Sequence, residues 1–158
     1  MYTIQSDITS KNTSINIKKL PAIYGRLNWD ALRERWAKIT NFERTPVVLD
    51  FGCGRYTDHI EHFLATKGFI YKGYDPFWKS KKENYEALSS EAYIIICSNV
   101  LNVIANKETV NNIQRYIRDF SFLASLGKTL VKEPSFYFIT VYEGDKSHIG
   151  KETKKDCW

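Results

Sequence analysis

Short apolar runs alternate along the chain with longer segments of helical period, and this alternation restricts the fold more than any other feature. The runs are rich in β-branched and aromatic residues, as buried strands are, and they cover residues 47–51, 69–74, 93–97 and 135–142. Parallel strands need a crossover connection, usually a helix, between one strand and the next. The order therefore predicts an α/β fold with a mainly parallel sheet and helices packed on its faces.

The segments between the runs carry apolar residues every three or four positions, as on one face of an amphipathic helix. We expect helices over residues 28–39, 57–67, 83–88 and 107–126. Asn28 is a favourable N-cap for the first of them, and Gly68 is a favourable C-terminal cap for the second. Both residues support the predicted boundaries.

The length of 158 residues favours a single domain. Polar residues without a clear period dominate both ends of the chain. We expect an N-terminal arm over residues 1–27, an α/β domain over residues 28–142 and a polar tail over residues 143–158.

The net charge of +5 comes from basic residues in short groups, at 18–19, 79–82 and 151–155. Two interpretations remain open for these groups. They are either solvated surface or a rim that attracts an anionic substrate such as DNA or RNA.

The cysteines Cys53, Cys97 and Cys157 lack metal-ligand spacing, which indicates a reducing compartment. His59 and His62 lie one helical turn apart without an assignable third ligand, so we expect no metal site. The sequence has neither a signal-peptide pattern nor an apolar run long enough to span a bilayer. These features predict a cytoplasmic protein with no membrane segment.

The first predicted strand ends in Asp50, and the turn that follows contains Gly52 and Gly54. Two glycines one residue apart let the backbone turn tightly and approach a ligand. The second predicted strand ends at Asp75, where a carboxylate can accept hydrogen bonds from a ribose. Ligands of open parallel sheets bind beyond the carboxyl ends of the strands, so this edge is the candidate site.

Two features distinguish this turn from a dinucleotide site. Asp50 would repel a pyrophosphate, whereas a cationic ligand with an amino-acid tail tolerates it. Thr57 stands where the third glycine of a dinucleotide fingerprint would be. Both features favour S-adenosylmethionine over NAD.

Residues 48–54, Val-Leu-Asp-Phe-Gly-Cys-Gly, resemble the first motif of class I S-adenosylmethionine-dependent methyltransferases. Residues 74–76 resemble the acidic end of that family's second strand, and residues 95–104 resemble its fourth strand and the following turn. Residues 98–104 are also similar to methyltransferases of phages and of DNA-phosphorothioation systems. The resemblance covers about residues 46–142. It implies a Rossmann-like, doubly wound sheet, shortened at its C-terminal edge relative to the family.

The resemblance also implies a role for individual residues. Asp50 and the turn Gly52-Cys53-Gly54 would hold the methionine portion, and Asp75 the ribose. Pro76, Phe77 and Trp78 would flank the adenine, and Ser98 and Asn99 would line the floor near the transferred methyl group.

The function that follows is methyl transfer from S-adenosylmethionine to an acceptor, either nucleic acid or a small molecule. Asn99 is not followed by the Pro-Pro pair of amino-methylating DNA enzymes, and no Pro-Cys nucleophile follows either. Three alternatives stay open: a protein that binds or degrades S-adenosylmethionine without methylating, a nucleotide-binding Rossmann module, and a nucleic-acid adaptor.

Two further expectations concern the C-terminal part of the chain. Glu143, Asp145 and His148 follow the last strand and are candidates for a general base. The edge strand over residues 135–142 invites pairing with a second copy, so a homodimer is expected there.

Overall fold

One sheet of four strands organises the structure, a computed structural model. The structure describes residues 20–40, 44–98, 100–101, 104, 107–125 and 136–140. The strands are β1 (Val47–Phe51), β2 (Ile70–Tyr74), β3 (Ala92–Ser98) and β4 (Phe136–Thr140). They lie in the order β2-β1-β3-β4, and each neighbouring pair is parallel. The predicted α/β class with a parallel sheet is confirmed.

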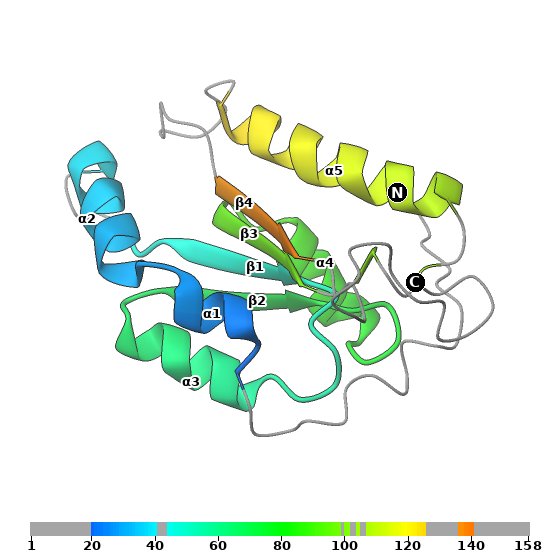
Figure 1. The fold of residues 1–158 in the computed structure, drawn as a ribbon, viewed down its shortest axis with the longest axis horizontal. Helices are drawn as coiled ribbons and strands as arrows, with labels where there is room; N and C mark the ends of the chain where they lie inside the picture. The colour runs from blue at the N-terminus through cyan, green and yellow to red at the C-terminus, as the bar shows by residue number, and fades with distance from the viewer. Residues whose placement is uncertain are drawn as a thin grey trace, which may run out of the picture.

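Five helices cover the two faces of this sheet in the described part of the chain. They are α1 (Ala22–Arg26), α2 (Trp29–Thr40), α3 (Asp58–Thr66), α4 (Lys81–Leu88) and α5 (Lys107–Ser125). Figure 1 shows α1, α2 and α3 on one side of the sheet and α5 on the other. Ala87 of α4 packs in the same apolar cluster as Ile113 and Ile117 of α5, so α4 shares the face of α5. The result is a three-layer arrangement.

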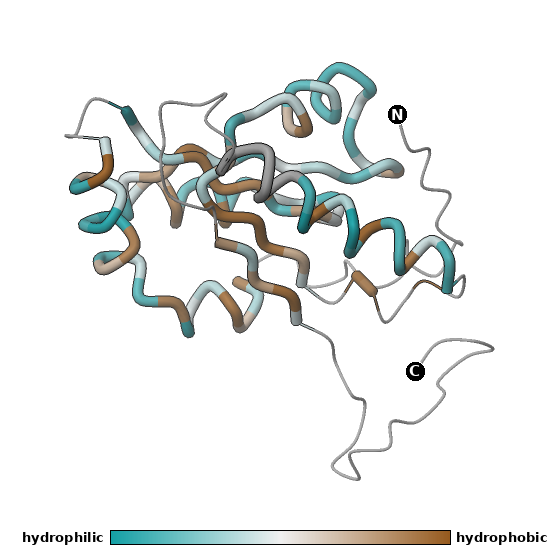
Figure 2. Tube along the Cα trace, turned by 90° about the horizontal axis from the view of Figure 1, so that it is seen from above, coloured by the Kyte–Doolittle hydropathy of each residue, from teal (hydrophilic) through white to brown (hydrophobic). Residues whose placement is uncertain are grey.

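The period of two in each strand sorts the core into two clusters. Val48 of β1 and Ile94 of β3 face α1, α2 and α3. Leu49 and Ile95, the next residues along, face α4 and α5. Because both faces are covered, these strands are apolar along most of their length, and Figure 2 shows them as the brown centre of the molecule.

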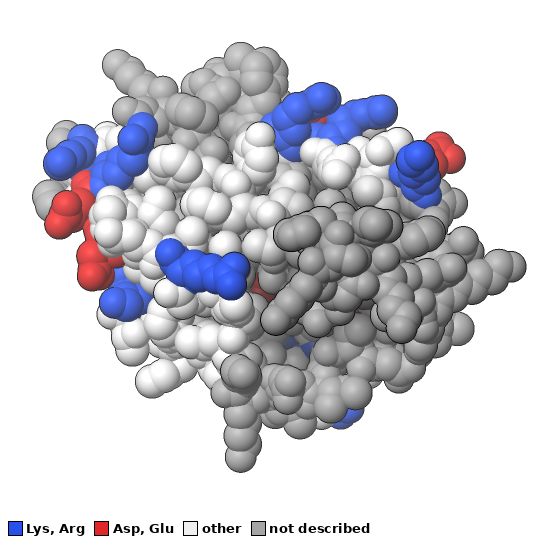
Figure 3. Space-filling view, viewed as in Figure 1, with Lys and Arg blue, Asp and Glu red and all other residues white. Residues whose placement is uncertain are grey.

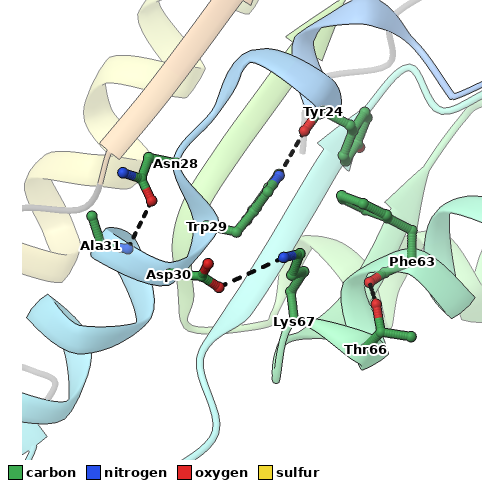
Figure 4. Close-up of polar contacts among 8 residues, drawn as sticks. All are labelled: Tyr24, Asn28, Trp29, Asp30, Ala31, Phe63, Thr66 and Lys67. Carbon is green, nitrogen blue, oxygen red and sulfur yellow. Dashed lines mark hydrogen bonds and ion pairs between the residues drawn. The ribbon is translucent and has the colours of Figure 1, made fainter.

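Aromatic packing joins the first two helices to α3. The ring of Trp29 lies 5.9 Å from that of Tyr24 and 6.1 Å from that of Phe63, and its indole Nε1 donates to the Tyr24 carbonyl at 2.7 Å (Figure 4). Asn28 caps α2 as predicted, since its Oδ1 accepts from the Ala31 amide at 3.1 Å. Helix α1 is not among the helices predicted from the sequence, although its Tyr24 is only 1% exposed.

The chain reverses its direction of travel across the sheet after β2. It passes from β1 to its neighbour β2, and then crosses through α4 to β3 on the opposite side of β1. The carboxyl ends of β1 and β3 therefore form the switch point of a Rossmann-like sheet, where ligands of such folds bind.

The other predicted helices are confirmed with small shifts of their ends. The short helix expected around residues 83–88 begins earlier, at Lys81, because Ser80 and Glu83 form a capping box. The predicted arm up to residue 19 and the tail over residues 143–158 lie outside the described residues. Within the described ranges, none of the helices combines the length and the apolarity that crossing a membrane requires.

Candidate functional site at the carboxyl edge of the sheet

The turn after β1 is fastened to the end of β2. Gly52 and Gly54 have φ angles of 83° and 73°, a region that suits glycine. The amides of Gly52 and Cys53 both donate to the Tyr74 carbonyl, at 2.8 and 3.1 Å. The Gly54 amide donates to Asp75 Oδ2 at 2.9 Å. All three amides of the turn are therefore engaged within the protein.

Asp75 holds two turns together through both of its carboxylate oxygens. Oδ2 accepts from Gly54, while Oδ1 accepts from the amides of Phe77 and Trp78 at 2.9 and 3.1 Å. An ionised carboxylate has about four acceptor positions. One position is left for a ligand, so Asp75 has room for one hydroxyl of a ribose rather than both.

Asn84 of α4 supports Asp75 through its backbone. Its Oδ1 accepts from the Asp75 amide at 2.9 Å, and its Nδ2 donates to the Asp75 carbonyl at 3.0 Å. Asn84 is not among the site residues predicted from the sequence. The capping box at Ser80 places the helix, but no sequence pattern indicates that an asparagine in its first turn reaches back to the strand end.

Asp50 is a carboxylate buried beneath two tyrosines. It is 4% exposed, and the Tyr71 hydroxyl of β2 donates to its Oδ2 at 3.4 Å. The Tyr24 hydroxyl approaches from α1, but it is buried and has no partner within bonding geometry among the described residues. Burial raises the pKa of Asp50 from 3.8 to about 6, against the lowering effect of the two hydroxyls. The negative charge of Asp75 raises this pKa further, and Lys79 lowers it.

The environment of the two described cysteines favours packing over reactivity. Burial, followed by the charge of Asp50, raises the pKa of Cys53 far above its usual range and that of Cys97 to about 12. A nucleophilic cysteine needs a lowered pKa. Their environment therefore favours the interpretation that they are structural.

The segment after β3 lies directly over the glycine turn. A Cβ on Gly52 would overlap the side chain of Val100, so Val100 fills the place that the glycine leaves free. Ser98 at the end of β3 shares a hydrogen bond of 2.9 Å with the Thr140 hydroxyl of β4. Asn99, the other residue expected near the transferred methyl group, lies outside the described residues.

The loops after β1 and β2 also make contact through basic side chains. The guanidinium of Arg55 lies 5.1 Å from the ring centre of Tyr56 and 5.3 Å from that of Trp78. Lys79 Nζ donates to the Thr57 hydroxyl at 3.0 Å. The resemblance predicts Trp78 beside an adenine, but no sequence pattern indicates that these two loops contact each other.

The remaining predicted site residues are placed at the same edge. Pro76 is exposed and Phe77 is half-buried, both in the turn that Asp75 caps. The candidate bases Glu143, Asp145 and His148 fall outside the described part of the chain. In the described part, no group of three His, Cys, Asp or Glu residues has the geometry to hold a metal ion.

The donor and acceptor groups at this edge suit a cation better than an anion. Two buried carboxylates lie close enough to influence each other electrostatically, and the turn amides that an anion would need already have partners.

Fold and site together define a Rossmann-like α/β domain with an acidic strand edge, a class compatible with binders of nucleotides and of S-adenosylmethionine. No protein-family model matches the chain, and comparisons with curated proteins and with solved structures also give no match.

Proposed function

We propose that the protein binds S-adenosylmethionine at the carboxyl edge of β1 and β2 and transfers its methyl group to an acceptor. Asp50 would face the amino-acid portion of this cofactor, and Asp75 would accept one hydrogen bond from its ribose. The exposed Pro76 and the half-buried Phe77 would flank the adenine.

The hydrogen bond from Gly54 to Asp75 carries the proposal. At 2.9 Å it joins the glycine turn of β1 to the acidic end of β2, the two motifs that the sequence offers for an adenosyl cofactor. Fixed in this way, the glycine turn and both carboxylates lie at one edge of the sheet, next to the switch point.

A dinucleotide is the less favoured ligand. Rossmann domains bind a pyrophosphate with free backbone amides at the turn and at the helix that follows it. The amides of Gly52, Cys53 and Gly54 are already bonded to Tyr74 and Asp75, and the nearby Asp50 would repel a phosphate.

Methyl transfer from a sulfonium is an in-line displacement, which requires alignment more than ionisable catalysts. Positioning alone supplies about 7–11 kcal/mol in favourable cases. The chain's own contribution is a rigid cofactor platform, since Asp75 fixes two turns at once and Asn84 fixes Asp75.

Calorimetric titration with S-adenosylhomocysteine and with NAD tests the binding step. We expect the wild-type protein to bind the homocysteine derivative and not NAD. Asp50→Asn should lower its affinity about ten-fold or more, because a hydrogen bond to a charged group contributes roughly 1.5–3 kcal/mol. The exposed Asp30, paired with Lys67 on the surface, provides the matched control Asp30→Asn, which should bind normally.

Preference for NAD, or equal affinities of the Asp50→Asn and wild-type proteins, would contradict the proposal. Incubation with methyl-labelled S-adenosylmethionine and candidate acceptors then tests transfer. Label in a macromolecule or a small-molecule product supports a methyltransferase, whereas unchanged cofactor or a breakdown product identifies the non-methylating alternative.

A further inference from the structure

The same edge of the sheet carries opposite charges at two depths. Asp50 and Asp75 are 4% and 7% exposed, whereas Arg55 and Tyr56, in the loop just above them, are exposed. A cationic ligand is suited to the buried layer, and an anionic one to the surface. The question is what the surface cations contact.

Two aromatic rings lie against Arg55 in the described part of the chain. Tyr56 and Trp78 each lie within 5.3 Å of its guanidinium, measured to the ring centre. No hydrogen bond or ion pair engages Arg55 among the described residues, although the exposed Asp58 follows three positions later. Stacking orients a guanidinium while its edge donors stay available for a bidentate oxyanion.

Lys79 places a second cation beside the first. Its Nζ donates to the hydroxyl of Thr57, two residues after Arg55. Its positive charge lowers the pKa of Asp50 in β1 and of Cys53 in the glycine turn. Both cations therefore belong to the loops that follow β1 and β2, at the carboxyl edge that holds the candidate cofactor site. On the part of the surface that Figure 3 shows in colour, Lys and Arg lie in several separate groups.

We propose that Arg55, Tyr56 and Lys79 bind the backbone and a base of a single-stranded nucleic acid, which is the acceptor presented to the cofactor. Phosphates contact Arg55 and Lys79, and the Tyr56 side chain, 37% exposed, offers a ring on which a base stacks. An acidic peptide would use the cations but not the ring, so a nucleic acid accounts for more of the surface. As the identity of the acceptor, this inference rests on the proposed function. As a binding site, it stands separately.

Fluorescence anisotropy of a short labelled single strand, titrated with the full chain at several salt concentrations, tests the inference. For Arg55→Gln we expect weaker binding and a salt slope reduced by about one. Arg55→Lys should keep the slope yet bind more weakly than the wild type, because an ammonium lacks the planar fork. Tyr56→Ala should bind about ten-fold more weakly.

Arg44 provides the matched control. It is exposed and paired with Glu91 at the opposite, amino edge of the sheet, so Arg44→Gln removes the same charge from a different place. Equal affinities of the Arg44→Gln and Arg55→Gln proteins would overturn the inference. The inference would also be overturned if Arg55 bound an acidic peptide and not the single-stranded nucleic acid.

The two proposals fail separately. If the protein binds the nucleic acid through Arg55 but does not bind S-adenosylhomocysteine, the nucleic-acid site is supported and the methyltransferase proposal is contradicted. If the protein binds S-adenosylhomocysteine and its affinity for the nucleic acid does not depend on Arg55, the cofactor site is supported and the nucleic-acid site is contradicted.

Discussion

Asp50 is an ionisable side chain that folding removes almost completely from solvent. Tyr71 donates one hydrogen bond to it, at the long distance of 3.4 Å, and the buried hydroxyl of Tyr24 approaches without completing a second. A carboxylate desolvated in this way binds a proton more tightly in the folded than in the unfolded chain. Its charge consequently costs stability wherever the folded protein must ionise it.

The stability of the protein should depend on pH through this group. The folded pKa of about 6 lies above the ordinary 3.8, so the stabilisation by the protonated acid is complete below about pH 4 and is lost as the pH rises through about 6. The difference between the folded and the ordinary pKa of Asp50 corresponds to about 3 kcal/mol in the free energy of unfolding. Urea unfolding of the wild type and of Asp50→Asn between about pH 4 and pH 7 should show the wild type losing up to about that amount relative to the variant.

Asp30→Asn serves as the control at this scale as well, because Asp30 is exposed on α2. Its unfolding free energies should follow those of the wild type at every pH. If the Asp50→Asn curve also runs parallel to the wild type, Asp50 is not the group that titrates.

At the scale of elements, helix α4 depends on a local signal. The Ser80 hydroxyl accepts from the Glu83 amide at 3.2 Å, and the Glu83 carboxylate accepts from the Ser80 amide at 2.7 Å. Ser80→Ala should lower the free energy of unfolding by about 1 kcal/mol, the usual cost of losing an N-cap side chain. Urea denaturation measures the change. Ser89→Ala, at the other end of α4, removes a hydroxyl without a capping bond and should cost less.

Elements with their own period or cap could be predicted from the sequence. Strands β1 and β3 are continuous apolar runs, and α2 begins at a capping asparagine. Helix α1 could not, since five residues with one buried side chain give too little pattern. It is helical because Tyr24 packs against Trp29 and Phe63. No sequence pattern indicates that Phe63, which lies in α3, contacts this segment.

In the candidate site, too, some residues could be predicted from the sequence and others could not. Asp50 and Asp75 could be placed at one edge, because parallel strands end together. The contacts made by Asn84 and Val100 could not be predicted. They depend on how helices and loops from other parts of the chain settle over the strand ends.

At the scale of the molecule, the sheet separates two cores that do not share side chains. Ile60 belongs to the cluster under α1, α2 and α3, and Ile113 to the cluster under α4 and α5. Each Ile→Val change should cost about 0.5–1.5 kcal/mol. The double variant should show the sum within about 0.5 kcal/mol, because the sites have no common partner.

Urea denaturation of the two single variants and the double variant checks this additivity. Ile139→Val on β4 is the comparison, since that side chain is 37% exposed and should cost less. A strong deviation from the sum would mean that the sheet transmits repacking from one face to the other.

Val100 occupies the space beside Gly52 that a Cβ would otherwise fill. A ligand that approached the Gly52 backbone from this side would have to displace that isopropyl group, and only the fraction of chains in which Val100 had moved would bind it. Apparent affinity is then weaker than intrinsic affinity by that fraction. A smaller side chain at position 100 would tighten binding without adding a single contact.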